Sequence, residues 1–213
     1  PAKEVGGDLY DFYMDGNHLY FLIGDVSGKG VPASLFMAIT RSLFRTLSQH
    51  VLSPAKIVTE MNNSISDNNE SNMFVTLIVG ILDLETGILK LCNAGHNPPI
   101  LIYPDGQVSY LEFKTQIFVG VVEDFKYSDE EVVLEKESKL FLYTDGVTEA
   151  ENINKELYGE EKLLEMLSDN ASSDVRTTVN VVVDSIASHV KEAEASDDLT
   201  ILLIQYEPGT ANS

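Results

Sequence analysis

The residues best suited to chemistry in this sequence are carboxylates at the ends of apolar segments, first Asp25 within Gly24-Asp25-Val26-Ser27-Gly28-Lys29-Gly30. This turn follows the apolar run 19–23, which predicts a buried strand, and precedes Pro32, which suits the first turn of a helix. Glycines let a backbone approach a small ligand, and Asp25 adds a hard oxygen donor suited to Mg²⁺ or Mn²⁺. The alternative is a tight strand-to-helix turn with a solvated aspartate.

The pair Gly28-Lys29 resembles the end of a nucleotide-binding phosphate loop. That loop requires a longer gap between its glycines and a Ser or Thr directly after the lysine, whereas here Gly30 follows Lys29. The glycine spacing of dinucleotide-binding proteins is also missing. We therefore exclude both kinds of nucleotide site.

Other acids share the placement of Asp25 at the end of a predicted strand. They are Asp8 after Gly6-Gly7, Asp145 after the apolar run 140–143, and Asp197 or Asp198 before the apolar run 201–204. Carboxylates brought together repel one another unless a cation neutralises them. Because no Cys or His cluster accompanies them, Mg²⁺ or Mn²⁺ is favoured over Zn²⁺. Two such ions about 3.5–4 Å apart can activate water for attack on a phosphoryl group.

A predicted hairpin brings two of these carboxylates together. Asp15-Gly16-Asn17 is a strong hairpin-turn pattern between an alternating segment that starts at Leu9 and the strand that ends at Asp25. We expect this hairpin to place Asp8, which precedes the first strand, beside Asp25.

Two helices are expected after the hairpin. The first carries a helical stripe of apolar residues, and the second begins at Ser53-Pro54, an N-cap followed by a first-turn proline. We expect both stripes to face the core: Leu35, Phe36, Ile39, Leu43, Phe44 and Leu47 in the first helix, and Ile57, Val58, Met61 and Ile65 in the second.

The remainder of the chain predicts mainly strands and then two more helices. The expected strands are 73–84, 88–92, 99–103, 108–111, 127–134, 139–143 and 201–204, and the expected helices are 159–167 and 174–190. Because no linker or repeat interrupts this pattern, we expect one domain over residues 1–207 and a disordered tail at 208–213.

His96 and Cys92 are the other side chains considered for a chemical role. His96 lies in the polar turn 93–99 and is either a metal ligand, a proton donor or a hydrogen-bonded structural histidine. Cys92 lacks the following loop ending in Arg that a cysteine phosphatase uses, and no G-x-S-x-G elbow is present. Water activated by metal is therefore the simplest nucleophile.

Composition limits the partners. The 213 residues include 34 acidic and 14 basic side chains, and the net charge of −20 disfavours nucleic acid and anionic membrane surfaces. A single cysteine excludes an internal disulfide and favours a reducing, cytoplasmic location. No membrane-spanning run or signal peptide is visible. The start at Pro1 suggests a domain cut from a longer protein. A membrane anchor in the missing N-terminal region of that protein is compatible with a cytoplasmic location of this domain.

Five motifs occur in order along the chain: Gly6-Gly7-Asp8-Leu9-Tyr10-Asp11, Gly24–Gly30, Asn93-Ala94-Gly95-His96-Asn97-Pro98, Thr144-Asp145-Gly146 and Asp197-Asp198-Leu199-Thr200. Together, from about Glu4 to Gln205, they resemble the SpoIIE/RsbU-like branch of the PPM metal-dependent serine/threonine phosphatases. Each motif alone is weak, but five in the same order with compatible spacing are specific.

The resemblance implies an α+β fold, an α-β-β-α sandwich with two central antiparallel sheets flanked by helices. It implies two Mn²⁺ or Mg²⁺ ions held by Asp8, Asp25, the backbone carbonyl of Val26, Asp145 and Asp197, with Asp25 as the bridging ligand and Asp8 as a ligand either directly or through water. Asp25 and Asp145 would then be catalytic through the activated water. The choice of Asp197 over Asp198 depends on a one-residue shift in alignment.

The sequence departs from the wider family in lacking an Arg near Asp8 for the substrate phosphate, which leaves that role to the metals, Lys29 or His96. The resemblance implies a phosphorylated STAS-domain anti-anti-sigma factor as substrate, in partner-switching control of transcription. It also implies an upstream sensor domain that acts through the helices of residues 31–66, which we expect to control activity and to offer a homodimer contact. The alternatives are a catalytically silent partner-binding module and a metal phosphodiesterase acting on a small molecule.

Overall fold

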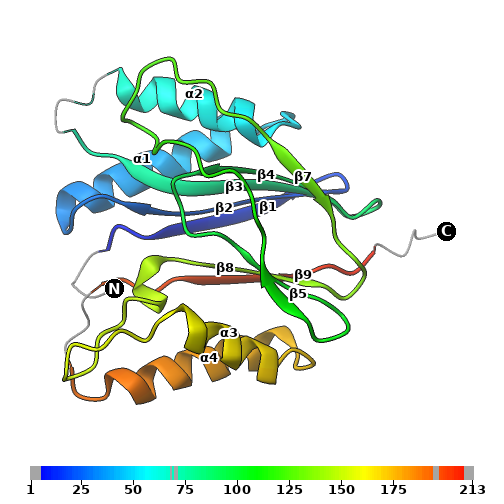
Figure 1. Ribbon diagram of the computed structural model, residues 1–213. Helices are drawn as coiled ribbons and strands as arrows, with labels where there is room; N and C mark the ends of the chain where they lie inside the picture. Colours follow the sequence, from blue (N-terminus) through cyan, green and yellow to red (C-terminus); the bar gives the residue numbers. More distant parts are fainter. Residues whose placement is uncertain (1–5, 68, 70–71, 194–196, 209–213) are drawn as a thin grey trace.

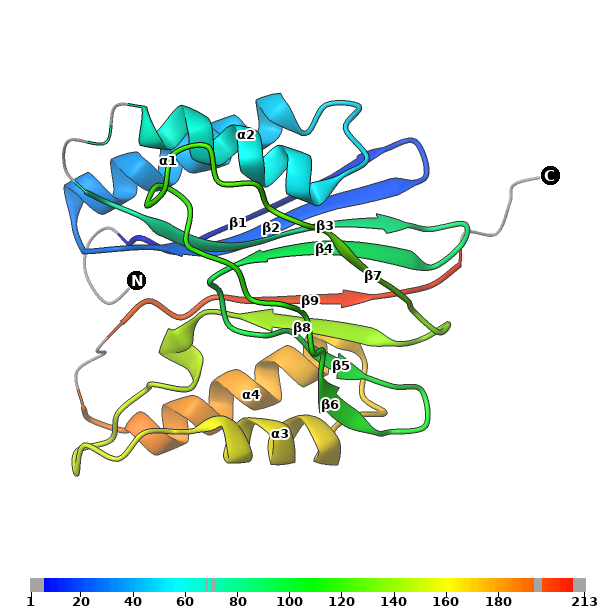
Figure 2. The ribbon, with the colours of Figure 1, turned by 45° about the horizontal axis from the view of Figure 1, so that its top comes forward.

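The computed structural model describes residues 6–67, 69, 72–193 and 197–208. Two antiparallel sheets pack face to face, and a pair of helices covers the outer face of each (Figure 1). Turning the molecule shows the same four layers, with α1 and α2 on one side and α3 and α4 on the other (Figure 2). The predicted α-β-β-α sandwich of the α+β class is confirmed.

The first sheet has the strand order β1-β2-β3-β4-β7. Its strands are β1 (Leu9–Asp15), β2 (His18–Val26), β3 (Val75–Asp83), β4 (Ile88–Ala94) and β7 (Glu130–Val133). The predicted hairpin is confirmed, since β1 and β2 pair from Leu9 opposite Gly24 to Asp15 opposite His18, with Gly16 at a φ of 58° in the turn. This register puts Asp8 and Asp25 at the same end of the sheet.

The second sheet has the order β6-β5-β8-β9. Its strands are β5 (Ile100–Ile102), β6 (Val108–Tyr110), β8 (Lys139–Tyr143) and β9 (Ile201–Gln205), and a short 3-10 helix (Asp145–Val147) follows β8. Apolar side chains from both sheets fill the space between them, including Phe21, Ile23, Leu140 and Leu142. Gly80 on β3 makes room for this layer, because a Cβ there would lie 2.1 Å from the Phe21 ring.

The outer helices are α1 (Val31–Leu47), α2 (Pro54–Ser66), α3 (Glu160–Asp169) and α4 (Val175–Val190). The predicted cap of α2 is confirmed: the Ser53 hydroxyl accepts a hydrogen bond from the Lys56 N–H at 3.3 Å. Asp174 caps α4 in the same way, accepting from the Thr177 N–H at 3.1 Å. Such caps satisfy donors that have no partner within the helix.

The apolar stripes are confirmed for α2 and only in part for α1. Phe44 is buried, and Phe36, Leu43 and Leu47 pack against the same core, but the side chains of Leu35 and Ile39 are 62% and 56% exposed. The prediction for these two residues was wrong. The stripe is wider than the contact of α1 with the sheet, so its outer edge remains at the surface.

The edge strand β1 is tied to α1 by an ion cluster formed by Asp11, Arg41 and Arg45. Arg45 donates to both oxygens of Asp11 and to the backbone carbonyl of Phe12 at 2.9 Å, and the Phe12 N–H donates to Asp11 Oδ1. Both backbone groups of Phe12 are thus satisfied without another strand. Edge strands with satisfied backbone groups are poor templates for unwanted pairing.

None of the described helices combines the length and the apolar character needed to cross a bilayer. Of the tail for which we expected disorder, residues 209–213 lie outside the described part of the chain, as do Glu4 and Val5 at the other end.

Candidate metal centre

The centre begins with two carboxylates from the β1–β2 hairpin and a threonine from the other sheet. Asp8 lies one residue before the Leu9–Gly24 pair, so it sits next to Asp25. The Thr144 hydroxyl, directly after β8, donates to Asp8 Oδ2 at 2.6 Å. Asp8 therefore links the two sheets at the end where their predicted acids meet.

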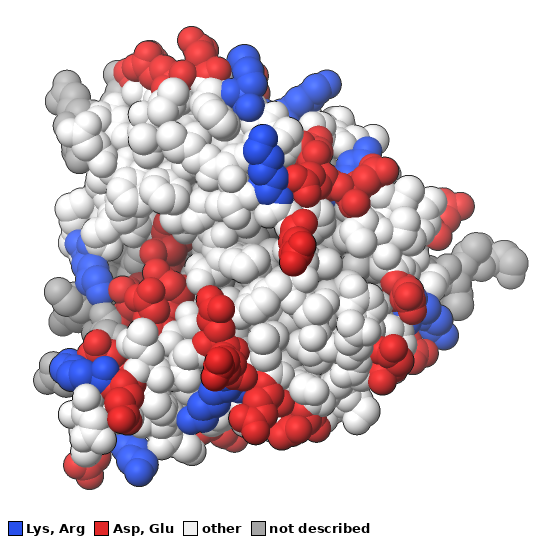
Figure 3. Space-filling model, in the orientation of Figure 1, with Lys and Arg blue, Asp and Glu red and all other residues white. Residues whose placement is uncertain are grey.

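The four candidate aspartates share one electrostatic environment. Burial, followed by the negative charges of Asp8, Asp145 and Asp197, raises the pKa of Asp25 to about 8. Burial and the charge of Asp197 likewise raise the pKa of Asp145. Burial also raises the pKa of Asp8, against the hydrogen bond from Thr144. Acidic side chains gather in a hollow between the two halves of the molecule, at the left of the view (Figure 3).

Glycines at this end are needed because polar atoms approach their backbones closely. A Cβ on Gly7 would lie 2.9 Å from the Val26 carbonyl oxygen and 3.4 Å from Asp25 Oδ1. A Cβ on Gly146 would lie 1.9 Å from the Asp198 carbonyl oxygen. The glycines of the first and fourth motifs thus have a packing reason, and the first turn lies directly against the predicted Val26 donor.

The neighbouring acids Asp197 and Asp198 have different surroundings. The Asp198 side chain is buried and accepts a hydrogen bond from the Gly7 N–H at 2.9 Å. Asp197 is partly exposed, accepts from Lys29 Nζ at 2.9 Å, and raises the pKa values of Asp25 and Asp145. Asp198 thus supports the Gly6-Gly7 turn, and its charge raises the pKa of Asp8, whereas the charge of Asp197 acts on Asp25 and Asp145.

The donor set fits a divalent cation in its chemistry. No three His, Cys, Asp or Glu side chains of the described residues already converge on one point, so a cation would need these side chains to move closer together. Oxygen donors without nitrogen or sulfur are the set that Mg²⁺ and Mn²⁺ prefer. The repulsion that raises the pKa of Asp25 is what a bound cation relieves.

His96 is a structural residue in this fold. Its ring is 3% exposed, Nδ1 bonds with Thr76 Oγ1 at 2.9 Å, and Nε2 bonds with the Tyr143 carbonyl at 3.1 Å. Burial lowers its pKa to about 4, so the ring is neutral near pH 7. The structure does not support the substrate-binding role expected for His96, because both nitrogens are occupied in joining β3 to β8.

Lys29 lies at the site, whereas two arginines are engaged elsewhere. Arg41 and Arg45 both bind Asp11 and are not placed for a substrate phosphate. Lys29, the other residue expected to bind phosphate, is bonded to Asp197.

Sequence reasoning gave no role to Thr144 or Glu149. Thr144 stands in the quoted Thr144-Asp145-Gly146 motif, but its bond to Asp8 spans 136 positions. Burial and the charges of Asp145 and Asp197 raise the pKa of Glu149, so it borders the same cluster. For Thr144, the sequence did offer one indication, because this polar residue directly precedes the motif aspartate Asp145.

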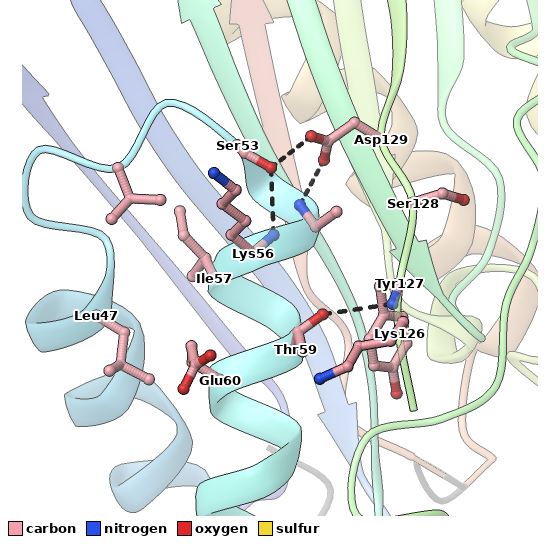
Figure 4. A pocket seen from close by; sticks show the side chains of 12 residues that line it. Leu47, Ser53, Lys56, Ile57, Thr59, Glu60, Lys126, Tyr127, Ser128 and Asp129 are labelled. Atoms are coloured by element: carbon pink, nitrogen blue, oxygen red, sulfur yellow. Dashed lines mark hydrogen bonds between the residues drawn. The ribbon is translucent and has the colours of Figure 1, made fainter. Parts of the chain in front are cut away.

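A cavity lies away from these acids. It has a volume of about 680 Å³ and is lined by residues of α2 and of the segment before β7, among them Lys56, Lys126 and Tyr127 (Figure 4). Its Asp129 accepts from the Ser53 hydroxyl at 2.6 Å and from the Ala55 N–H. That carboxylate caps a helix, so the cavity lacks the converging acids of the candidate metal centre.

Comparison with known proteins agrees with this geometry. The sequence model of the Stage II sporulation protein E (SpoIIE) family matches residues 15–207. The phosphoserine phosphatase RsbU of Bacillus subtilis is 27% identical over 96% of this chain and 61% of its own length. The chain spans about a third to three fifths of the length of the curated relatives that it matches.

Solved structures show the same fold. The SiaA-PP2C domain of Pseudomonas aeruginosa has a TM-score of 0.87 with 22% identity, covering 97% of this chain and 83% of that domain. RsbX in complex with magnesium has a TM-score of 0.71 with 20% identity, covering 95% and 88%. The described chain thus has the architecture of PP2C-type phosphatase domains.

Proposed function

Because this chain belongs to the Stage II sporulation protein E (SpoIIE) family, we propose that it is a metal-dependent protein serine/threonine phosphatase. The observation that carries the proposal is the meeting of Asp8 and Asp25, from the β1–β2 hairpin, with acids of the other sheet, where burial and three neighbouring aspartates raise the pKa of Asp25 to about 8. A cluster of this kind is costly in a fold unless it serves to hold cations.

In this proposal Asp8, Asp25, Asp145 and Asp197, with the Val26 carbonyl, hold two Mn²⁺ or Mg²⁺ ions. When bound, such ions supply an activated water and neutralise charge on the phosphoryl group. The protein orients the ligands. The Thr144 hydroxyl holds one oxygen of Asp8, which leaves the other carboxylate oxygen for a metal ion. Asp198 holds the Gly6-Gly7 turn against the donor carbonyl. Asp25 and Asp145 are the catalytic residues, acting through the water.

The proposed substrate is phosphoserine or phosphothreonine on a STAS-domain anti-anti-sigma factor, in partner-switching control of transcription. Support comes from the relative named phosphoserine phosphatase RsbU. It also comes from the fold shared with a Mycobacterium tuberculosis protein whose solved structure contains RsbU and RsbW domains. An upstream sensor domain, a homodimer contact through residues 31–66 and a cytoplasmic location complete the proposal.

The test is phosphate release from a phosphorylated STAS protein, measured with added Mn²⁺ and again after exhaustive chelation. We expect release with Mn²⁺ or Mg²⁺ and none after chelation. Full activity without metal would exclude the two-metal mechanism. Tight binding of the phosphoprotein without release would identify a silent binding module, and turnover of a cyclic or diester substrate alone would identify a small-molecule phosphodiesterase.

A further inference from the structure

An ion pair closes one side of the candidate metal centre. Lys29 Nζ lies 2.9 Å from Asp197 Oδ2, and both side chains are partly exposed, at 44% and 40%. The pair joins the turn between β2 and α1 to the segment before β9, across 168 positions of sequence. The lysine of the Gly24–Gly30 motif is therefore bonded to an acid of the fifth motif.

This lysine neutralises part of the acidic cluster. Its positive charge opposes the rise in the pKa of Asp145, while the hydrogen bond to Asp197 and the charges of Asp197, Asp198 and Asp25 hold the pKa of Lys29 above its ordinary value. Other ion pairs of the described residues, such as those of Arg41 and Arg45 with Asp11, involve none of the candidate ligands. Lys29 thus acts where a divalent cation would act.

Lys29 lies between two glycines whose surroundings are open. Gly28 and Gly30 have φ angles of 89° and 79°, and a Cβ added to either would meet no atom within 4 Å. Glycines on both sides keep the barrier to reorientation low, because they lack the steric limits of other residues. Lys29 itself lies in the turn after β2 and outside the buried strand.

We propose that Lys29 is an internal counter-cation that competes with the metal for Asp197 and so sets the metal concentration at which the centre fills. The inference rests on the proposed function. An oxygen bonded to an ammonium is a poorer metal ligand, and a nearby positive charge repels a second cation. Metal binding therefore requires Lys29 to move away.

A simple role in binding the substrate phosphate makes a different prediction. In that case, removing Lys29 would weaken substrate binding and leave metal affinity in the absence of substrate unchanged. Competition for Asp197 instead predicts tighter metal binding without the lysine. The two roles are separated by a measurement that contains no substrate.

The experiment is calorimetric titration of Mn²⁺ into the metal-free chain, with thermal unfolding of the metal-free protein as a second readout. We expect Lys29→Met to bind Mn²⁺ about three- to tenfold more tightly, because an exposed ion pair and one opposing charge are removed. The same variant should unfold at a lower temperature without metal. Lys29→Arg should restore wild-type values on both readouts.

The matched control is Lys136→Met, since Lys136 forms an exposed pair with Glu137 at 3.5 Å, outside the centre. Unchanged or weaker Mn²⁺ binding by Lys29→Met would overturn the inference. If no variant binds Mn²⁺, the proposed metal centre and this inference both fail. If Mn²⁺ binds with the expected shift but no phosphate is released, only the proposed function fails.

Discussion

Asp11 on β1 and Asp25 on β2 belong to one hairpin, yet their charges are balanced in opposite ways. Asp11 is bound by Arg45 through two hydrogen bonds and by Arg41 Nε at 3.1 Å, and these arginines lower its pKa. Asp25 has other aspartates as neighbours, and its pKa is raised to about 8.

This contrast separates Asp11, which stabilises the fold, from Asp25, which belongs to the candidate metal centre. At Asp11 the protein supplies the opposing charge, so the carboxylate stabilises the contact between β1 and α1. At Asp25 the surrounding acids add to the repulsion, and stability is given up where a ligand is expected to act. Asp11 is the more buried of the two residues, yet its pKa is lowered, so the sign of the neighbouring charges decides the direction of the shift.

The largest expected effect is on turnover. Asp25→Asn or Asp145→Asn should reduce phosphate release by about a thousandfold or more, since catalytic metal supplies several kcal/mol of transition-state stabilisation. The fold should persist, and metal-free stability should rise because repulsion falls. Asp184→Asn, on the exposed face of α4, is the control. Near-normal turnover and Mn²⁺ affinity in either variant would remove that residue from the ligand set.

A smaller effect, on stability, is expected at the Asp11 cluster. Asp11→Asn should lower the free energy of unfolding by about 2 kcal/mol, as expected for lost hydrogen bonds to charged groups. Arg45→Met should cost more than Arg41→Met, because Arg45 binds both carboxylate oxygens and lies 4.7 Å from the Tyr13 ring centre. Urea unfolding measures these changes. Equal stability of wild type and Asp11→Asn would contradict the scaffold role.

The two aspartates should also respond to pH with opposite signs. In metal-free protein, the folded pKa of Asp25 lies above its ordinary value of 3.8, so stability should fall as pH rises from about 4 to 8. The folded pKa of Asp11 lies below 3.8, so its stabilisation is present above that value and lost as pH falls through the folded pKa.

Unfolding free energies across this range, after metal removal, measure both trends. Asp25→Asn should flatten the curve between pH 5 and 8 relative to wild type, and Asp11→Asn should flatten it only below about pH 4. A curve for Asp25→Asn that keeps the wild-type slope would show that the repulsion is not centred on this residue.

The smallest effect is expected for changes in α1 and α2, since α1 begins where the Gly24–Gly30 turn ends. Met61→Leu should cost less than about 1.5 kcal/mol of stability, as volume-conserving core changes do, and Phe44→Leu should cost more because it removes volume at a fully buried position. Since α1 starts directly after Gly30, we also expect such changes to alter the Mn²⁺ concentration for half-maximal activity beyond the loss of stability. Activity that follows stability in every variant would make these helices scaffold only.

Local patterns in the sequence determined the elements and their order. Alternation, helical periodicity, Ser53 as a cap and the Asp15-Gly16-Asn17 turn all act over a few residues, and the structure bears them out. The hairpin also fixed the approach of Asp8 to Asp25, because an antiparallel register follows from its turn.

Only the tertiary structure decided which partner each polar group has. The bonds of His96 to Thr76 and Tyr143, of Asp198 to Gly7 and of Lys29 to Asp197 join distant segments. The exposure of Leu35 and Ile39 likewise depends on how much of α1 the sheet covers. A sequence states the charge and size of a residue, but the opposing charge and the covering surface come from residues that folding brings next to it.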